Sequence, residues 1–404
     1  MLSSADTALR NAITAHRAGR LTEAEVGYRR VLRKYPAEPT ALYYLGLLHF
    51  HRGDARSGVE YVSRSLEHAP ANGRAWNDLG GMLLSLGRAP EAKEAYGRAV
   101  EVAPESADGW YNLGICLRNE GDIEGAVEKL RAATLRQTNY SRAYDALASL
   151  LYQLGRSQEA AEIYLQWVVR DPGNPKARHM AAASSGQNTP PRASEEYIRD
   201  FFDNAAPDFD DTVGKLGYRA PETVAAALAR WSAGRELVTV LDAGCGTGLC
   251  GGLIRAMCRT LVGLDLSERM IDKARARGCY DELVAAELVG FMRSRPNAFD
   301  AIVCVDTFVY FGALEDALAA ARDALLASGL LIFTLEAAKT GECDHRLEFH
   351  GRYVHSEMYV RRAVATAGLE LVALSLETLR SERLENVAGY VAVARRDQEP
   401  RRGS

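Results

Sequence analysis

The residues best suited to chemistry gather where a short apolar segment ends in an acid and a run of glycines. The segment Val238–Leu241 leads into Asp242. Gly244, Gly246 and Gly248 follow at alternate positions. Glycine allows a sharp backbone turn with positive φ and lets a ligand lie against the backbone, because no Cβ atom stands in the way. The spacing predicts a turn that binds a nucleotide or nucleoside between a strand and a helix.

The acid before the glycines separates two classes of ligand. Gly246, Gly248 and Gly251 also satisfy the dinucleotide pattern G-x-G-x-x-G, so a nicotinamide cofactor is an alternative. A pyrophosphate would lie at the start of the following helix, where the carboxylate of Asp242 would repel it. The sulfonium and ammonium groups of S-adenosylmethionine suit that carboxylate better, and this charge argument favours a methyl donor.

A second acid stands 21 positions beyond Gly244, at the end of the next apolar segment. Asp265 follows Thr260–Leu264, and its carboxylate can accept two hydrogen bonds from a ribose diol. Leu266 and Met270 come next and can pack on an adenine ring. Both classes of nucleotide use such an acid, so Asp265 predicts a nucleoside without identifying it.

Short β-branched segments alternate with helical segments around these residues, which predicts a doubly wound sheet with ligands at the carboxyl ends of its strands. The last two strands follow one another without room for a helix and are expected to pair antiparallel. The expected sheet is mostly parallel and has seven strands. The strands are Val238–Leu241, Thr260–Leu264, Glu282–Ala285, Ala301–Val305, Leu330–Leu335, Leu369–Leu379 and Val387–Ala394, and the helices between them are Gly248–Met257, Glu268–Arg277 and Leu314–Ala327.

The first half of the chain repeats itself every 34 residues. Leu45, Leu79 and Leu113 keep this spacing, and a glycine returns five times at the same step, at Gly19, Gly53, Gly87, Gly121 and Gly155. The pattern closely resembles the tetratricopeptide repeat, which implies five pairs of antiparallel helices over residues 5–174, stacked into an all-α superhelix. Residues 175–183 are expected to cap this array.

Such arrays line a concave groove with one helix of each pair, and the resemblance implies a protein or peptide partner there. Self-association, or docking on the second half of the chain, is the alternative. The residues expected to contact the partner are Tyr43, Asn77, Tyr111, Asn112 and Arg118.

Residues 193–396 resemble a class I S-adenosylmethionine-dependent methyltransferase, and the whole chain resembles predicted bacterial methyltransferases that carry tetratricopeptide repeats. Tyr197–Asp203, Leu216–Pro221 and Phe299–Tyr310 match segments of that group. The resemblance implies that Tyr218 contacts the methionyl end of the cofactor. It also places Glu287 near the adenine amino group and Asp306 at the methyl-transfer site. The full set of expected cofactor residues is Tyr218, Asp242, Gly244, Cys245, Gly246, Gly248, Asp265, Leu266, Met270, Glu287 and Asp306.

The segment Gly351–Tyr359 follows the fifth strand, where this fold usually contributes residues that contact the acceptor. Tyr353 and His355 are the predicted catalytic residues, with His355 the candidate base because an imidazole titrates near pH 6.5. The alternative is that Ser356 caps a helix and His355 lies on its surface.

Composition limits the remaining classes. The chain has 404 residues and a net charge of −4, without the basic excess of a nucleic-acid-binding protein. Its seven cysteines are scattered and never spaced C-x-x-C, so neither a disulfide framework nor a metal site is predicted, and a cytoplasmic setting is expected. No apolar run is long enough to span a membrane.

These features divide the chain into an array at 1–183, a linker at 184–192, a methyltransferase domain at 193–396 and a tail at 397–404. The expected function is methyl transfer from S-adenosylmethionine to an acceptor, protein or peptide, that the array recruits. The alternatives are a scaffold protein whose second domain is structural or regulatory, and a methyltransferase acting on small molecules such as natural products.

Overall fold

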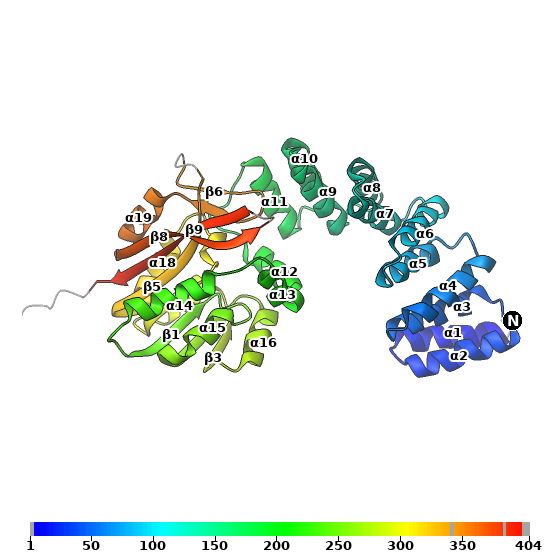
Figure 1. Ribbon diagram of the computed structural model, residues 1–404, viewed down its shortest axis with the longest axis horizontal. Helices are drawn as coiled ribbons and strands as arrows, with labels where there is room; N and C mark the ends of the chain where they lie inside the picture. Colours follow the sequence, from blue (N-terminus) through cyan, green and yellow to red (C-terminus); the bar gives the residue numbers. More distant parts are fainter. Residues whose placement is uncertain (1–3, 340–342, 383–384, 398–404) are drawn as a thin grey trace, which may run out of the picture. The chain divides into compact units, whose positions relative to one another are not determined.

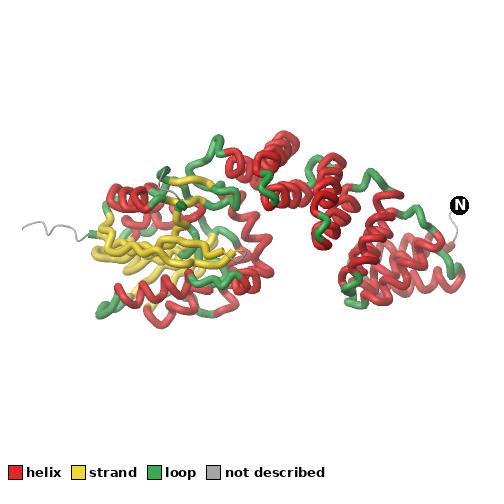
Figure 2. The backbone as a smooth tube through the Cα atoms, turned by 45° about the horizontal axis from the view of Figure 1, so that its top comes forward, coloured by secondary structure: helices red, strands yellow, loops and turns green. Residues whose placement is uncertain are grey.

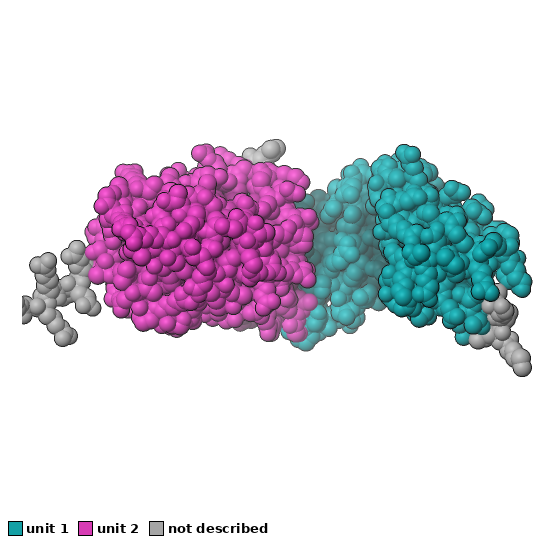
Figure 3. All heavy atoms as spheres, turned by 90° about the horizontal axis from the view of Figure 1, so that it is seen from below, with its two compact units in different colours: residues 1–172 teal, residues 173–404 magenta. Residues whose placement is uncertain are grey.

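The computed structural model describes residues 4–339, 343–382 and 385–397. The chain divides into two compact units, residues 1–172 and residues 173–404, coloured separately in Figure 3. The first unit is helical, and the second contains the strands (Figure 2).

Ten helices, counted over the described part of the first unit, form five consecutive pairs (Figure 1). The two helices of each pair pack together, and the second helix of a pair packs on the first of the next. This arrangement confirms the array predicted from the 34-residue period. The bounds are α1 Ser4–Arg17, α2 Leu21–Lys34, α3 Pro39–His51, α4 Ala55–His68, α5 Gly73–Ser85, α6 Ala89–Val102, α7 Ala107–Glu120, α8 Ile123–Arg136, α9 Ser141–Gln153 and α10 Ser157–Arg170.

The recurring glycines lie where the first helix of each pair turns into the second. Gly53 has φ 86° and Gly121 has φ 89°, in the left-handed region that favours glycine. A second recurring glycine permits close helix packing, since a Cβ atom added to Gly80 would lie 2.6 Å from the ring of Tyr96. Backbone geometry and helix contact therefore account for the two glycine positions of the repeat.

The second unit begins with helices and continues as an alternating α/β domain. The helices are α11 Pro175–Ser185, α12 Glu195–Ala205, α13 Phe209–Lys215, α14 Ala220–Trp231, α15 Leu249–Ile254, α16 Glu268–Arg277, α17 Leu288–Ser294, α18 Glu315–Ala324 and α19 Glu357–Thr366, with short 3-10 turns η1 Ala206–Asp208, η2 Arg255–Met257 and η3 Phe308–Tyr310. The strands are β1 Leu237–Ala243, β2 Cys258–Asp265, β3 Glu282–Ala285, β4 Phe299–Cys304, β5 Leu325–Ala337, β6 His345–Leu347, β7 Tyr353–His355, β8 Leu369–Glu382 and β9 Glu385–Arg396.

All strands of the described residues belong to one sheet of nine strands, in the order β3-β2-β1-β4-β5-β7-β6, with β9 beside β5 and β8 beside β9. The pairs from β3 through β5 are parallel, and β5–β9 and β8–β9 are antiparallel, as expected. The prediction of seven strands was incomplete, because the three-residue strands β6 and β7 form a hairpin beside the carboxyl end of β5.

Helices cover both faces of the sheet, each over its own apolar core. On one face α17, α18 and α19 pack on side chains that include Phe299, Leu331 and Phe333. On the other face α14 and α15 pack on side chains that include Val240, Leu261 and Ile332. Apolar side chains on both faces hold the central strands between these helices. Because β1, β2 and β4 run parallel, their carboxyl ends lie at one edge of the sheet.

Helix α11, which was predicted to cap the array, belongs to the second unit. Its His179 donates from Nε2 to the carbonyl of Gly351, at 2.9 Å, and stacks on the Tyr197 ring with centroids 4.0 Å apart. Ala182 and Ala183 pack with Tyr353. The unit boundary therefore falls at residue 172 and not at 183.

The stretch 184–192, predicted as a linker, is also fixed to the second unit. The carbonyl of Pro191 accepts hydrogen bonds from the backbone N–H groups of Gly312 and Ala313. The carbonyl of Pro190 accepts one from the Tyr353 hydroxyl, at 2.6 Å. The small, polar residues of this stretch therefore form a segment that is hydrogen-bonded to the second unit and is not a flexible linker. Of the predicted tail, only residue 397 is described.

Candidate functional site

A cavity of about 490 Å³ opens at the carboxyl ends of the parallel strands. Its wall comes from the turns after β1, β2, β3 and β4, and from α12 and α13. The structure brings most of the predicted cofactor residues to this wall and leaves two outside it, Gly248 and Met270. The predicted residues that line the cavity are Tyr218, Asp242, Gly244, Cys245, Gly246, Asp265, Leu266, Glu287 and Asp306.

The turn after β1 needs glycine at two positions for different reasons. Gly244 has φ 84°, and a Cβ atom there would lie 2.0 Å from Thr307 Oγ1. Gly246 has φ 54°, and a Cβ atom there would meet nothing within 4 Å. The first glycine lets the turn pack on the β4 side of the fold, and the second leaves open space at the cavity wall.

Asp242 is fully buried beneath this turn. The Tyr280 hydroxyl donates to its Oδ2 at 2.8 Å, while its Oδ1 receives no hydrogen bond from the described residues. Burial raises the pKa of the Asp242 carboxyl to about 7, an effect that the hydrogen bond from Tyr280 offsets only in part. An unpartnered buried carboxylate oxygen in a cavity wall favours a cationic or hydrogen-bond-donating ligand.

Asp265 at the end of β2 holds two backbone N–H groups. Gly246 donates to its Oδ2 and Ser267 to its Oδ1, both at 2.9 Å. Each carboxylate oxygen accepts more than one hydrogen bond, so the same side chain can also receive two hydroxyl groups from the cavity. Burial raises the pKa of Asp265, although the backbone hydrogen bonds oppose that shift. Asp265 therefore ties the β1 turn to the β2 turn.

Leu266 and Glu287 border the cavity near the ends of β2 and β3. Glu287 accepts from the backbone N–H groups of Val289 and Gly290, at 3.0 and 2.7 Å, and from Arg192 at 2.7 Å. Burial raises the pKa of Glu287, but these hydrogen bonds outweigh it and the net pKa is lowered. Met270 lies on the buried face of α16 and does not reach the cavity.

Asp306, just beyond β4, is held in an uncommon backbone conformation. Its φ of 48° lies in the left-handed region, and its N–H donates to Thr334 Oγ1 at 2.8 Å. Thr334 in turn donates to Asp306 Oδ1, and Arg380 donates to Oδ2 at 3.1 Å. Burial, followed by the charge of Asp306, raises the pKa of Tyr218 well above its usual value.

Helices α12 and α13 form a cover over the cavity, to which they contribute Phe202 and Phe209. Two carboxylates fasten this cover to the loops below it. Asp203 accepts from Ser267 Oγ, and Asp210 accepts from Thr247 Oγ1, both at 2.5 Å. Arg277 also donates to Asp210 at 2.5 Å. The cover is therefore hydrogen-bonded to the turns after β1 and β2.

The predicted catalytic residues Tyr353 and His355 do not line the cavity. Both are fully buried, and His355 Nε2 donates to the carbonyls of Phe311 and Gly312 at 2.9 and 3.2 Å. Burial, followed by the neighbouring His345, lowers the pKa of His355 to about 4. His355 is therefore packed away from the cavity, and Ser356 caps α19 as in the alternative interpretation, although His355 does not lie on the helix surface as that interpretation expected.

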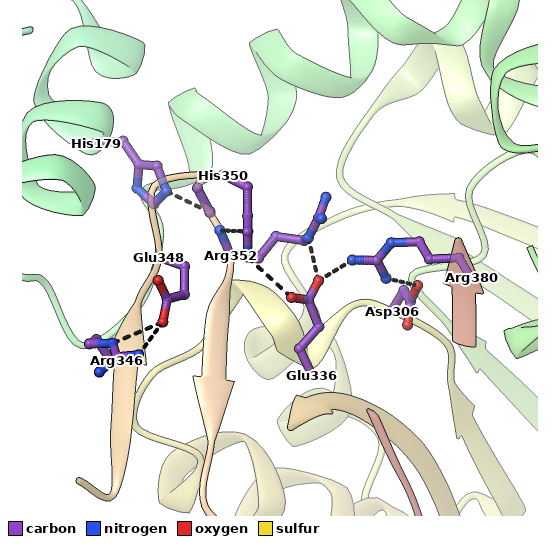
Figure 4. Close-up of polar contacts among 9 residues, drawn as sticks. His179, Asp306, Glu336, Arg346, Glu348, His350, Arg352 and Arg380 are labelled. Atoms are coloured by element: carbon purple, nitrogen blue, oxygen red, sulfur yellow. Dashed lines mark hydrogen bonds and ion pairs between the residues drawn. The ribbon is translucent and has the colours of Figure 1, made fainter. Parts of the chain in front are cut away.

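The hairpin places a different residue in the cavity wall, Arg352, beside Arg380 of β8. Arg352 Nε donates to Glu336 Oε1 at 2.5 Å, and Arg380 donates to the same oxygen (Figure 4). His350 Nε2 lies 3.3 Å from Glu336 Oε2. Burial raises the pKa of Glu336, but the two guanidinium groups outweigh it and the net pKa is lowered. Neither arginine was predicted from the sequence.

In the first unit, the expected groove residues lie on the first helices of neighbouring pairs. Asn112 Nδ2 donates to Asn77 Oδ1 at 2.9 Å, and the Tyr43 hydroxyl donates to Asp78. The guanidinium carbon of Arg142 lies over the ring of Tyr111, 4.8 Å from the ring centroid. Arg118 is exposed. Polar side chains thus connect successive pairs along this surface.

Comparison with known proteins assigns each half of the chain. Residues 240–329 match the methyltransferase domain family, and residues 9–72, 52–92, 83–142 and 121–175 match the tetratricopeptide repeat family. Human methyltransferase-like protein 27 is 36% identical over 119 residues, which are 29% of this chain and 46% of that protein. The chain thus spans less than half the length of this relative.

Solved structures resemble each half separately. The crystal structure of the (4+2)-cyclase SpnF is 15% identical, with a TM-score of 0.43 over 52% of this chain and 98% of that one. YrrB, described as a tetratricopeptide repeat protein with an unusual peptide-binding site, is 21% identical, with a TM-score of 0.37 over 43% of this chain and 89% of that one. In the described residues, none of the helices is long and apolar enough to cross a bilayer. From the family matches, the chain carries tetratricopeptide repeats followed by a methyltransferase domain.

Proposed function

We propose that the protein is an S-adenosylmethionine-dependent methyltransferase and that the cavity of the second unit binds the cofactor. The observation that carries this proposal is the unpartnered Oδ1 of Asp242, buried in the cavity wall beside the open space at Gly246. A carboxylate next to a bare backbone turn suits a ligand that brings positive charge and a flat nucleoside. These residues fit that cofactor and disfavour a pyrophosphate.

The cavity residues then divide between the two ends of the cofactor. Asp265 would accept the ribose hydroxyls, and Leu266 would pack on the adenine with Glu287 near its amino group. Asp242 and Tyr218 would face the methionyl end. Met270, which is buried away from the cavity, is left out of this assignment.

When bound, the cofactor supplies a methyl group on a positively charged sulfur, which leaves as a neutral thioether. The protein contributes orientation and the exclusion of water, which together lower the barrier of an in-line displacement. Phe202 and Phe209 of the cover would shield the reacting atoms, and the hydrogen bonds of Asp203 and Asp210 would keep that cover closed.

The array is proposed to recruit a protein or peptide that bears the acceptor. Amides such as Asn77 and Asn112 can bond a peptide backbone, and an exposed cation such as Arg118 can bond a carboxylate. A fused recruiting unit raises the local concentration of its cargo. A cytoplasmic setting, expected from the scattered cysteines of the sequence, is part of this proposal.

Titration calorimetry with S-adenosylmethionine tests the cofactor proposal. The protein should release or take up heat on binding, and Asp265→Ala should weaken the affinity at least tenfold through loss of the ribose contact. Asp272→Ala is the matched control, since Asp272 is an exposed acid on α16 of the same unit. No heat with the unmodified protein would leave only the scaffold interpretation.

Radiolabelled cofactor tests the acceptor. The full chain and a variant carrying Asn77→Ala, Asn112→Ala and Arg118→Ala are each incubated with cell extract, and labelled macromolecules are separated from small molecules. We expect macromolecular label that falls in the groove variant. Label confined to small molecules would instead support the small-molecule methyltransferase.

A further inference from the structure

Two arginines of the cavity wall are held side by side. Arg352 lies in the hairpin turn just before β7 and Arg380 lies in β8, and both donate to one oxygen of Glu336. Figure 4 shows this carboxylate between the two guanidinium groups, with Asp306 beyond Arg380. Because one oxygen receives both, the two guanidinium groups are neighbours at the cavity surface.

The burial of this cluster is hard to explain by stability alone. The side chains of Arg380 and Glu336 are 5% and 4% exposed. Removing such charges from water costs several kcal/mol per ion, and apolar residues in their place are often equally stabilising. A guanidinium has five N–H donors in a planar fork, so an arginine that holds one carboxylate can also bind another. The cluster is built like a receptor for a planar anion.

Several acidic groups of the described cavity lining are already held by hydrogen bonds from the protein. Asp265, Glu287 and Asp306 each accept hydrogen bonds on both carboxylate oxygens. The pKa of Tyr218 lies well above its usual value because the side chain is buried. An acceptor that enters the cavity already ionised needs no base, in contrast to an amine or a phenol that must lose a proton.

We infer that Arg352 and Arg380 bind a carboxylate of the methyl acceptor, and that the product is a methyl ester. This inference rests on the proposed methyltransferase function. The carboxylate oxygen forms a bond to the methyl carbon while the carbon–sulfur bond breaks and its electron pair remains on sulfur. One anion and one cation become two neutral products, and no proton is transferred. A cavity lined by Phe202 and Phe209 favours this loss of charge.

The cofactor also carries a carboxylate, and the same chemistry could hold it. The two sources are distinguished by binding S-adenosylmethionine and its decarboxylated analogue to the unmodified protein and to Arg352→Gln. We expect Arg352→Gln to change both affinities by less than about twofold. If the variant abolishes the preference for S-adenosylmethionine over the analogue, the arginines bind the cofactor and the inference is overturned.

A defined probe tests the acceptor side. Benzoate and the neutral benzamide are titrated into the full chain saturated with S-adenosylhomocysteine, and binding is followed by saturation-transfer NMR. We expect benzoate to bind at least tenfold more tightly than benzamide, the ratio expected from one charge-assisted hydrogen bond. Arg352→Gln should remove that preference. Equal binding of the two probes would overturn the inference.

Two further variants show whether a lost benzoate preference comes from the arginines or from misfolding. Arg346→Gln is the matched control, because exposed Arg346 pairs with Glu348 on the same hairpin and does not line the cavity. Arg380→Lys keeps a charge opposite Glu336 while removing the planar fork, so it should reduce the benzoate preference in a folded protein. Benzoate preference retained in both Arg352→Gln and Arg380→Lys would contradict the inference.

Turnover gives a separate readout. Methyl esters release methanol in alkali, whereas methyl groups on nitrogen, sulfur or a phenol oxygen do not. The label transferred from radioactive cofactor in cell extract should become volatile after alkali treatment. Alkali-stable label would overturn the ester inference and leave the methyltransferase proposal intact, whereas absence of cofactor binding would remove both.

Discussion

Asp242 illustrates how a single buried acid couples ligand binding to pH. Its pKa is raised to about 7, so the carboxyl is largely protonated at pH 5.5 in the free protein. A cationic ligand favours the ionised form and lowers this pKa on binding. Binding therefore releases a proton below pH 7, and affinity must increase as the pH rises toward 7.

We predict that the affinity for S-adenosylmethionine increases about tenfold between pH 5.5 and 7. Calorimetry in buffers of different ionisation enthalpy should detect the released proton. Asp242→Asn cannot titrate, so its affinity should stay nearly constant over the same range. A pH-independent affinity in the unmodified protein would contradict the assignment of Asp242 to the cationic end of the cofactor.

Two glycines of the β1 turn provide a paired test of fold against binding. Gly244→Ala places a methyl group on Thr307 at a positive φ, which should lower the free energy of unfolding by about 2 to 5 kcal/mol. Gly246→Ala meets no neighbour and should cost only about 1 to 2 kcal/mol for the left-handed backbone. Its methyl group should nevertheless weaken cofactor binding at least tenfold. Thermal unfolding and calorimetry on both variants measure the two effects.

At the residue scale, sequence patterns located the turn glycines and both acids but missed the arginines. The segment Gly351–Tyr359, predicted to contact the acceptor, contributes one residue to the cavity wall. Within it, Arg352 reaches the cavity, and Tyr353 and His355 do not. Arg352 lies in the turn just before the three-residue strand β7, and the sequence pattern did not predict that strand. The partner that fixes Arg352 and Arg380 is Glu336, and this long-range pairing is not visible in the sequence.

At the element scale, the cover formed by α12 and α13 should control ligand exchange. Asp210 receives hydrogen bonds from Thr247 and Arg277, which belong to the loops and helix beneath it. Asp210→Asn should weaken this attachment and speed cofactor release about threefold to tenfold, since exposed charged pairs contribute modestly.

Stopped-flow displacement of a fluorescent cofactor analogue measures that release rate. Asp211→Asn is the matched control, because it changes the same charge at the next position of α13, where the side chain is exposed. Equal release rates in the two variants would show that the attachment of Asp210 does not limit exchange.

Several elements were predicted to the residue, and the errors have local causes. Helix α16 and strand β3 have the predicted bounds, Glu268–Arg277 and Glu282–Ala285, because capping residues and apolar periodicity agree there. Helix α18 was extended too far, to Ala327, whereas β5 begins at Leu325. The alanine- and leucine-rich sequence at this junction is compatible with either a helix or a strand. The backbone leaves its regular path at Ser328, with φ 62°, where the β4 pairing also shifts register.

At the scale of the whole molecule, the division at residue 172 makes a direct prediction about fragments. Residues 173–404 retain α11, which buries His179 against Tyr197 and packs Ala182 against Tyr353. This fragment should fold alone and bind the cofactor with the affinity of the full chain. Thermal unfolding and calorimetry test both expectations.

A fragment that starts at residue 187, after α11, provides the comparison. It exposes Tyr197 and the Gly351 carbonyl, so its free energy of unfolding should be lower by at least about 3 kcal/mol. If both fragments are equally stable, α11 is not an integral part of the second unit. The sequence could not settle this point, because α11 continues the helical pattern of the array and its partners lie far along the chain.

The cavity wall also implies an order of events during synthesis. Tyr218 precedes the first strand, Asp306 follows the fourth, and Arg380 lies in the eighth. A ribosome delivers these three positions in that sequence, and the repeats emerge before any of them. The repeats of a nascent chain can therefore fold before the cavity is complete. The cavity wall is complete only after β8, the first strand of the last hairpin, has been synthesised.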